Sequence, residues 1–111
     1  MGSEMCIRDS DEYDINQRII EALTNTCSHA ILFSIVGNEK DAIQIANELQ
    51  ISLSAVYKTL VSLEKLSLVE IQRFHINDDN KKIKMYRSKI KKADISINEN
   101  KSEVFLHQNK Y

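Results

Sequence analysis

The sequence predicts an α+β fold that is mainly α. Apolar residues recur at helical spacing through most of residues 11–66, which favours several short amphipathic helices. Residues 68–88 instead alternate between apolar and polar side chains around an Asn-Asp-Asp-Asn stretch, which predicts two strands and a turn. With 111 residues, 42% of them apolar, we expect one domain with a modest core, which a second copy would help by sharing buried surface.

The first ten residues fit no element. Within them, Cys6 to Ser10 resembles a translated sequencing-adapter tail, so residues 1–10 are interpreted as a non-native tail and left out of the fold. The rest divides into a main domain over residues 11–92 and a C-terminal hairpin and tail over residues 93–111.

The first two predicted helices cover residues 11–25 and 26–36. Each carries its apolar side chains on one face, which we expect to be buried. These side chains are Ile15, Ile19, Ala22 and Leu23, then Ile31, Leu32, Ile35 and Val36. Thr26 or Ser28 is a candidate cap for the second helix, and Gly37 fits the left-handed conformation in which many helices end.

Two further helices, over residues 41–50 and 52–66, are separated only by a tight turn. Asp41 is a candidate cap for the first. Ser52 can cap the second, because its hydroxyl accepts from backbone N–H groups that lack a partner at a helix start. The apolar stripe of the second helix consists of Val56, Leu60 and Leu63. Two helices, a tight turn and a capped second helix make a helix-turn-helix.

The strand pair covers residues 68–76 and 82–88, with a turn at Asn77–Asn80. The alternation slips by one residue at Gln72–Arg73, which predicts a β-bulge. A helix-turn-helix followed by a strand pair is the winged-helix arrangement, and the strand pair is its wing. Two aspartates at the tip argue against deep insertion of this wing into a minor groove.

A second hairpin is expected after the wing. Residues 94–98 alternate, with Ile95 and Ile97 predicted to point inward, and residues 103–106 are again strand-like. Such a hairpin would extend the sheet or contact another subunit, and residues 107–111 are predicted to be a frayed end.

Charge is unevenly distributed along the chain, although its net value is only −1. Residues 1–51 hold three basic and nine acidic residues, and residues 52–92 hold ten basic and four acidic ones. A positive block that coincides with the 52–66 helix and the wing is typical of a surface that binds a polyanion. The alternative is a solvated surface with chance clustering.

The segment from about Ser28 to Ser88 resembles the ArsR/MarR-like winged-helix transcriptional regulators, particularly the small archaeal ones. The resemblance is carried by IANELQIS (45–52), by residues 54–60, by LEKLSLVE (63–70) and by the basic wing turn. It implies a homodimer that binds double-stranded DNA, with the 52–66 helix in the major groove and the wing on the backbone. The helix over residues 11–25 would then serve dimerisation, or pack across the same core.

Seven DNA contacts are expected from the 52–66 helix: Ser52, Ser54, Ala55, Tyr57, Lys58, Ser62 and Lys65. Four phosphate contacts are expected from the wing over residues 73–84: Arg73, Lys81, Lys82 and Lys84. Lys58 is the strongest single candidate, because a cation there reaches a phosphate or a guanine edge. Each has a structural alternative: an ordinary exposed lysine for Lys58, capping for Ser52, and partial burial for Tyr57.

No cofactor, metal or membrane is expected. The arsenic-type site that the resemblance implies needs a Cys-x-Cys pair, and Asp41 and Ile43 stand at those positions. Cys27 and His29 alone do not make a four-ligand zinc site, and Cys27 is interpreted as a free thiol. No glycine-rich phosphate loop or nucleophile elbow indicates an enzyme. Without a signal peptide or an apolar span, a cytoplasmic location is expected.

Two functions stay open. The first is a sequence-specific DNA-binding transcriptional regulator, and the second is a winged-helix protein-protein interaction module of transcription or replication machinery. The basic face separates them, because a module that binds only protein does not need Lys58, Lys65 and the wing lysines. Non-specific nucleoid-type binding is disfavoured by a net charge near zero.

Overall fold

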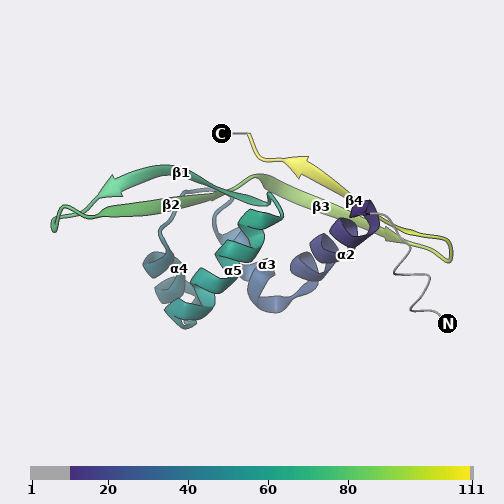
Figure 1. The fold of residues 1–111 in the computed structure, drawn as a ribbon, viewed down its shortest axis with the longest axis horizontal. Coiled ribbons are helices and arrows are strands. Elements are labelled where there is room, and N and C mark those ends of the chain that lie inside the picture. Colours follow the sequence, from purple (N-terminus) through teal and green to yellow (C-terminus); the bar gives the residue numbers. More distant parts are fainter. Residues whose placement is uncertain (1–10, 111) are drawn as a thin grey trace.

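The computed structural model describes residues 11–110, and side chains from Ile15 onward (Figure 1). The four helices of this part are α2 (Asp11–Thr24), α3 (Thr26–Ser34), α4 (Ala42–Leu49) and α5 (Leu53–Lys65). The four strands are β1 (Val69–Ile76), β2 (Lys82–Ser88), β3 (Ile90–Ile97) and β4 (Ser102–Gln108). The predicted α+β class is confirmed.

The first hairpin, β1–β2, is the predicted wing. Its antiparallel register shifts between Ile71 and Arg73, which confirms the bulge. In the turn, the Asn77 side chain accepts from the backbone N–H groups of Asp79 and Lys81 at 3.0 and 2.9 Å. Asn80 adopts φ 63°, a left-handed conformation that asparagine tolerates well.

The second hairpin, β3–β4, follows β2 after a single residue. Figure 1 shows the two hairpins laid end to end over the helices, with β1 and β2 reaching past α4 and the other pair past α2. The hairpins meet at Lys89, whose N–H donates to Leu68 O (2.9 Å) and whose carbonyl accepts from Asn109 N–H (2.8 Å). The expectation of a frayed end from residue 107 is therefore wrong. The strand β4 continues to Gln108, and the backbone N–H of Asn109 is hydrogen-bonded to Lys89 O.

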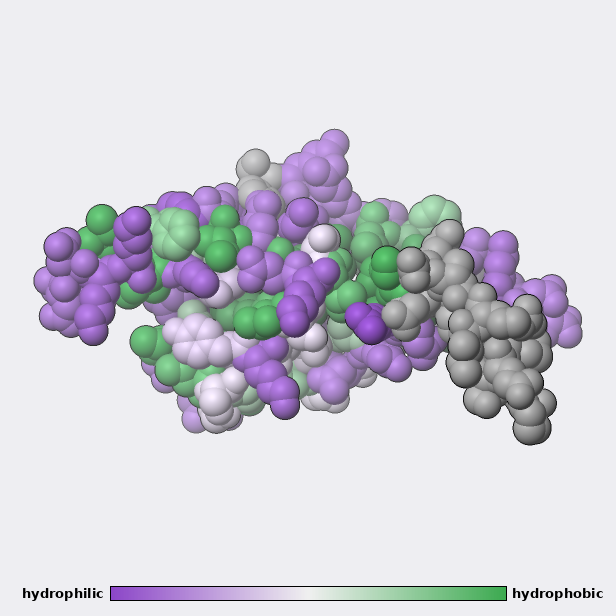
Figure 2. Space-filling view, viewed as in Figure 1, coloured by the Kyte–Doolittle hydropathy of each residue, from purple (hydrophilic) through white to green (hydrophobic). Residues whose placement is uncertain are grey.

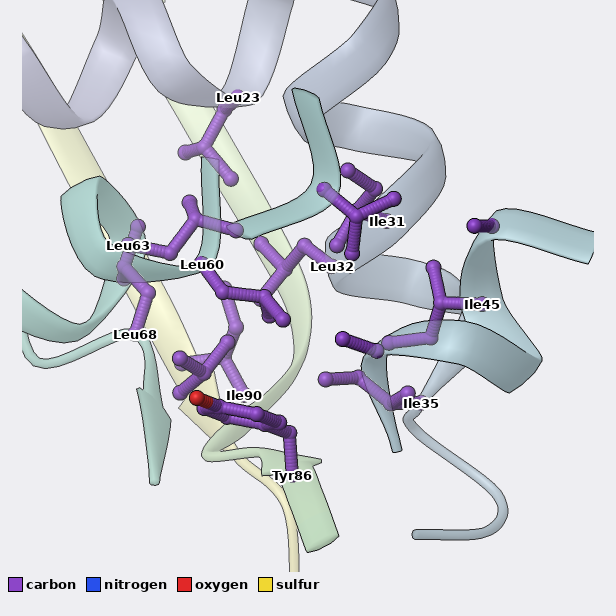
Figure 3. Close-up of a cluster of buried hydrophobic side chains, with 14 of the residues drawn as sticks. Leu23, Ile31, Leu32, Ile35, Ile45, Leu60, Leu63, Leu68, Tyr86 and Ile90 are labelled. Atoms are coloured by element: carbon purple, nitrogen blue, oxygen red, sulfur yellow. The ribbon is translucent and has the colours of Figure 1, made fainter. Parts of the chain in front are cut away.

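The core lies between the helices and the region where the two hairpins meet (Figure 3). Each element except α2 and β4 contributes at least one side chain that is at most 4% exposed. They include Ile31, Leu32, Ile35, Ile45, Val56, Leu60, Leu63, Leu68, Val69, Tyr86 and Ile90. Burying one such aliphatic side chain contributes roughly 1.5–3 kcal/mol, so the α5 stripe Val56, Leu60 and Leu63 fixes this helix on the core.

Local signals placed two of the helix starts correctly. Gln44 N–H donates to Asp41 Oδ1 (2.7 Å) at the start of α4, and Ala55 N–H donates to Ser52 Oγ (3.2 Å) at the start of α5. The cap of α3 is Asn25, whose side chain accepts from Ser28 N–H (3.0 Å), and not Thr26 or Ser28.

The end of α3 also differs from the prediction. Gly37 has no positive φ, so the left-handed cap is absent. At the helix end itself, the N–H of the cap residue Ile35 donates to Leu32 O (3.4 Å). Arg87 holds the chain just beyond the helix: its guanidinium donates to the carbonyls of Val36 and Gly37, both at 3.1 Å. The Asn109 side chain donates a further hydrogen bond to Val36 O (3.0 Å).

The inward orientation predicted for Ile95 and Ile97 is wrong. Ile95 is 36% exposed and Ile97 is 69% exposed, because the outer half of the second hairpin extends beyond the helices that could cover it. Ile15 and Val36, also expected to be buried, are respectively exposed and half-buried.

Candidate nucleic-acid interface

The interface is built around α5, whose buried stripe turns the opposite side of the helix to solvent. Ser54, Lys58 and Lys65 are exposed on that side, at the helical spacing expected of one face. Val61, which was not among the predicted contacts, shares this face and is 48% exposed. Lys58 thus lies on the surface of α5, as predicted.

Apolar side chains form a second exposed row on α5. Leu53, Tyr57 and Val61 follow one another every four residues, and they are 39%, 47% and 48% exposed. Of this row, only Tyr57 was predicted to contact DNA. The sequence does indicate the row, because Leu53 and Val61 lie four residues before and after Tyr57 and do not belong to the buried stripe of α5. We call Leu53, Tyr57 and Val61 the exposed apolar row.

A cleft of about 350 Å³ separates this row from the wing. It lies between the start of α4, α5 and β2, and is lined by Asp41, Ala42, Ile43, Tyr57, Val61, Lys82, Ile83, Lys84 and Tyr86. Burial raises the pKa of the Tyr86 phenol, and the nearby Glu64 and Tyr57 raise it further. The cleft brings two predicted wing contacts, Lys82 and Lys84, beside Tyr57.

The two faces of the wing carry different side chains. Phe74 pairs with Lys84 and Ile76 with Lys82, so these four side chains share the face that borders the cleft. On this face the Lys82 ammonium lies 5.9 Å from the centroid of the Phe74 ring. Figure 2 shows apolar surface (green) interleaved with hydrophilic surface (purple) along the wing and over the helices beneath it.

Arg73 lies on the other face of the wing. It pairs with Met85 and is adjacent to Phe74, and the side chains of a strand alternate between faces. Its guanidinium forms an ion pair with Glu39 in the connection between α3 and α4. The structure therefore separates Arg73 from Lys82 and Lys84, whereas the exposed Lys81 follows the tip turn.

The remaining predicted residues occupy the other flank of α5. Ser62 and Lys65 line a second hollow together with Arg18 and Glu21 of α2, whereas Ala55 is half-buried. Ser52 is exposed, and its hydroxyl caps α5 by accepting a hydrogen bond from Ala55 N–H. The predicted helix contacts thus spread around α5, and only Tyr57 reaches the cleft.

The positive block of the sequence is also divided in space. Arg87 holds the end of α3, and Lys89, Lys91 and Lys92 belong to the junction and to β3. The basic side chains that remain on α5 and the outer wing are Lys58, Lys65, Arg73, Lys81, Lys82 and Lys84. Fewer cations than the sequence count suggests can therefore act on one surface.

The part of the chain that the structure describes shows no group of three or more His, Cys, Asp or Glu that could hold a metal ion. Cys27 is a half-buried free thiol, with its sulfur 3.9 Å from Thr59 Oγ1 of α5. Over the same residues, no helix has the length and apolar character needed to cross a bilayer.

The helix-turn-helix, the wing that follows it and the order of these elements along the chain together define a winged-helix fold. A short third strand contact completes the wing at its base, where Lys40 and Tyr86 exchange backbone hydrogen bonds at 3.0 and 2.8 Å. The connection between α3 and α4 thereby fixes β2 against the helix-turn-helix.

Solved structures share this fold. NolR from Sinorhizobium fredii is 26% identical over 70% of this chain and 72% of its own, with a TM-score of 0.57. HlyU from Vibrio cholerae N16961 is 19% identical over 72% of this chain and 80% of its own, with a TM-score of 0.54. A third match is Mb0332 from Mycobacterium bovis, 24% identical over 73% of each chain, with a TM-score of 0.56.

The matching part of Mb0332 is described as a homodimeric winged helix-turn-helix DNA-binding domain of a possible ArsR-family transcriptional regulator. All three organisms are bacteria, so the archaeal subset of the resemblance gains no support. No protein-family model and no curated protein matches the chain.

Proposed function

We propose that this protein is a DNA-binding transcriptional regulator that places α5 in the major groove and its wing on the flanking backbone. One observation carries the proposal: Tyr57 and Val61, which flank the exposed Lys58 on α5, line the same cleft as the wing lysines Lys82 and Lys84. The likeness in fold to a winged helix-turn-helix DNA-binding domain supports it.

The geometry suits a duplex. A major groove about 12 Å wide admits one α-helix. Lys58 would then reach a phosphate or a guanine edge, and the capped start of α5 would present backbone N–H groups to a phosphate. Lys82 and Lys84, on the wing face that borders the cleft, would contact the backbone beside the groove. This is a binding role, and we assign the protein no catalytic step.

A homodimer belongs to the same proposal, since two copies would read two half-sites about one helical turn apart. The surface that we assign to the second copy is the outer part of the β3–β4 hairpin. Ile95, Ile97 and Leu106 are exposed on one face of it, where paired and alternate residues share a side. Burial of this face in a dimer would explain why apolar side chains occupy it.

The second candidate function is a protein-protein interaction module. One specific observation favours it: Ile43, Tyr57 and Val61 line the cleft with apolar surface, and such surface also suits the side chains of another protein. The lysines that flank the cleft favour DNA over this alternative.

The test is fluorescence anisotropy of the full chain with mixed duplex DNA at about 50 and 200 mM salt, where phosphate-driven binding weakens strongly. Lys58→Ala is expected to reduce the affinity at least several-fold. The matched control is Lys110→Ala, which removes an exposed lysine that follows β4 and should leave binding unchanged.

Equal losses from both variants would mean that binding depends on net charge and not on α5. A complete lack of binding at low salt would refute the regulator proposal and direct attention to a protein partner.

A further inference from the structure

The side chains of α5 leave few means of reading bases through hydrogen bonds. Its sequence, LSAVYKTLVSLEK, contains no arginine, asparagine or glutamine. Arginine pairs with guanine through two hydrogen bonds in the major groove, and asparagine or glutamine pairs with adenine in the same way. On this helix only the two lysines could form the contact with guanine, and Lys65 lies near the end of the helix, in the hollow beside α2.

The exposed apolar row offers a different kind of contact. Of the four bases, only thymine presents an apolar group in the major groove, its C5-methyl. Leu53, Tyr57 and Val61 are each between 39% and 48% exposed, so their side chains are available to such a group. Lys58 on α5 and Lys82 and Lys84 across the cleft flank the row with positive charge, which complements phosphates on both sides of a groove.

The spacing of the row also suits a duplex. Residues four apart on a helix are separated by about 6 Å along its axis. Base pairs rise by about 3.4 Å each, so neighbouring members of the row lie about two base-pair steps apart.

We propose that α5 recognises thymine C5-methyl groups through Leu53, Tyr57 and Val61, and that each half-site of its operator carries thymines at the corresponding steps. This inference rests on the proposed DNA-binding function. It assigns the discrimination of thymine to the apolar row, whereas phosphate contacts from the lysines supply affinity that does not depend on sequence.

The experiment starts with selection of a preferred site from random duplex DNA by the full chain. Each thymine of a selected half-site is then replaced by deoxyuridine, which removes the methyl group and leaves every hydrogen-bonding group in place. Burial of one methyl-sized group contributes about 0.8 kcal/mol, so each methyl that is read should cost about fourfold in affinity when it is removed.

Val61→Ala identifies the protein partner of one methyl. The variant should bind the thymine and deoxyuridine duplexes equally at one position and keep the discrimination at the others. Lys58→Ala is the matched control, and it should weaken binding to both duplexes by the same factor. The exposure of Val61 and the higher helix propensity of alanine keep α5 folded.

The outcomes separate the inference from the function on which it rests. DNA binding with equal affinity for thymine and deoxyuridine would overturn the inference while leaving the DNA-binding function in place. The same holds if selection returns half-sites without thymine. Loss of all DNA binding would instead refute the function, and the apolar row would then belong to a protein contact.

Discussion

Asp94 and His107 face each other across the second hairpin, with 2.7 Å between Asp94 Oδ2 and His107 Nε2. This hydrogen bond is the largest cause that lowers the pKa of the Asp94 carboxyl, and the charge of Lys92 lowers it further. A carboxyl whose pKa is lower in the folded state stabilises the fold above the ordinary pKa of aspartate. The contribution is lost as the pH falls through the lowered value.

We predict that His107→Ala, which removes the hydrogen-bond donor, returns the pKa of Asp94 toward its ordinary range. An NMR titration that follows the side-chain carboxyl carbon of Asp94 measures this directly. Lys92→Gln is the comparison, because the Lys92 ammonium lies 4.0 Å from Asp94 Oδ1. A larger change from Lys92→Gln than from His107→Ala would assign the low pKa to charge and contradict the hydrogen-bond explanation.

At the scale of single elements, the start of α5 depends on the Ser52 hydroxyl. Ser52→Ala should lower the free energy of unfolding by about 1 kcal/mol, the typical cost of removing such a cap. Denaturant unfolding followed by circular dichroism measures the change. Ser52→Asn should retain most of the stability, because asparagine also caps helices.

Ser62→Ala removes a hydroxyl from an exposed position later in the same helix and serves as the control. It should leave stability unchanged or raise it slightly, since alanine has the higher helix propensity. If Ser62→Ala cost as much as Ser52→Ala, the capping explanation would fail.

The elements also show how far a sequence can be interpreted. Caps such as Asp41 and Ser52 were predictable because their partners lie three residues away along the chain. The connection that follows α3 was not, since the donors to the Val36 carbonyl come from Arg87 and Asn109, far along the chain. Gly37 then suggested a left-handed cap that the helix does not use.

The candidate site was predictable to a similar degree. Helical periodicity correctly placed Lys58 on the surface of α5, because the buried stripe fixes the orientation of the helix. It could not show that Glu39 pairs with Arg73, or that Ser62 and Lys65 border α2. Alternation in the second hairpin likewise defines its two faces, but not whether another element covers Ile97.

At the scale of the whole molecule, the two hairpins end in exposed isoleucines on opposite sides of the helical part: Ile76 on the wing and Ile97 on the second hairpin. If the second hairpin contacts another copy, Ile97→Asp should convert a dimer to a monomer, because burying an unpaired carboxylate in an interface is costly. Size-exclusion chromatography with light scattering at tens of micromolar protein measures the mass.

Ile76→Asp is the matched control, since it places the same charge at the end of the other hairpin and should leave the dimer intact. A dimer that resists Ile97→Asp would move the interface away from the second hairpin. A monomeric wild-type protein would contradict the homodimer proposal itself.

The contacts at the end of α3 have a consequence for synthesis of the chain on the ribosome. The two side chains that bond to the Val36 carbonyl follow it by 51 residues, for Arg87, and by 73 residues, for Asn109. The helices α2 to α5 and β1 are therefore synthesised before either donor exists. This carbonyl obtains both partners only after Asn109 has been synthesised, so a nascent chain that stops after the wing lacks the Asn109 bond that ties the second hairpin to the helical part.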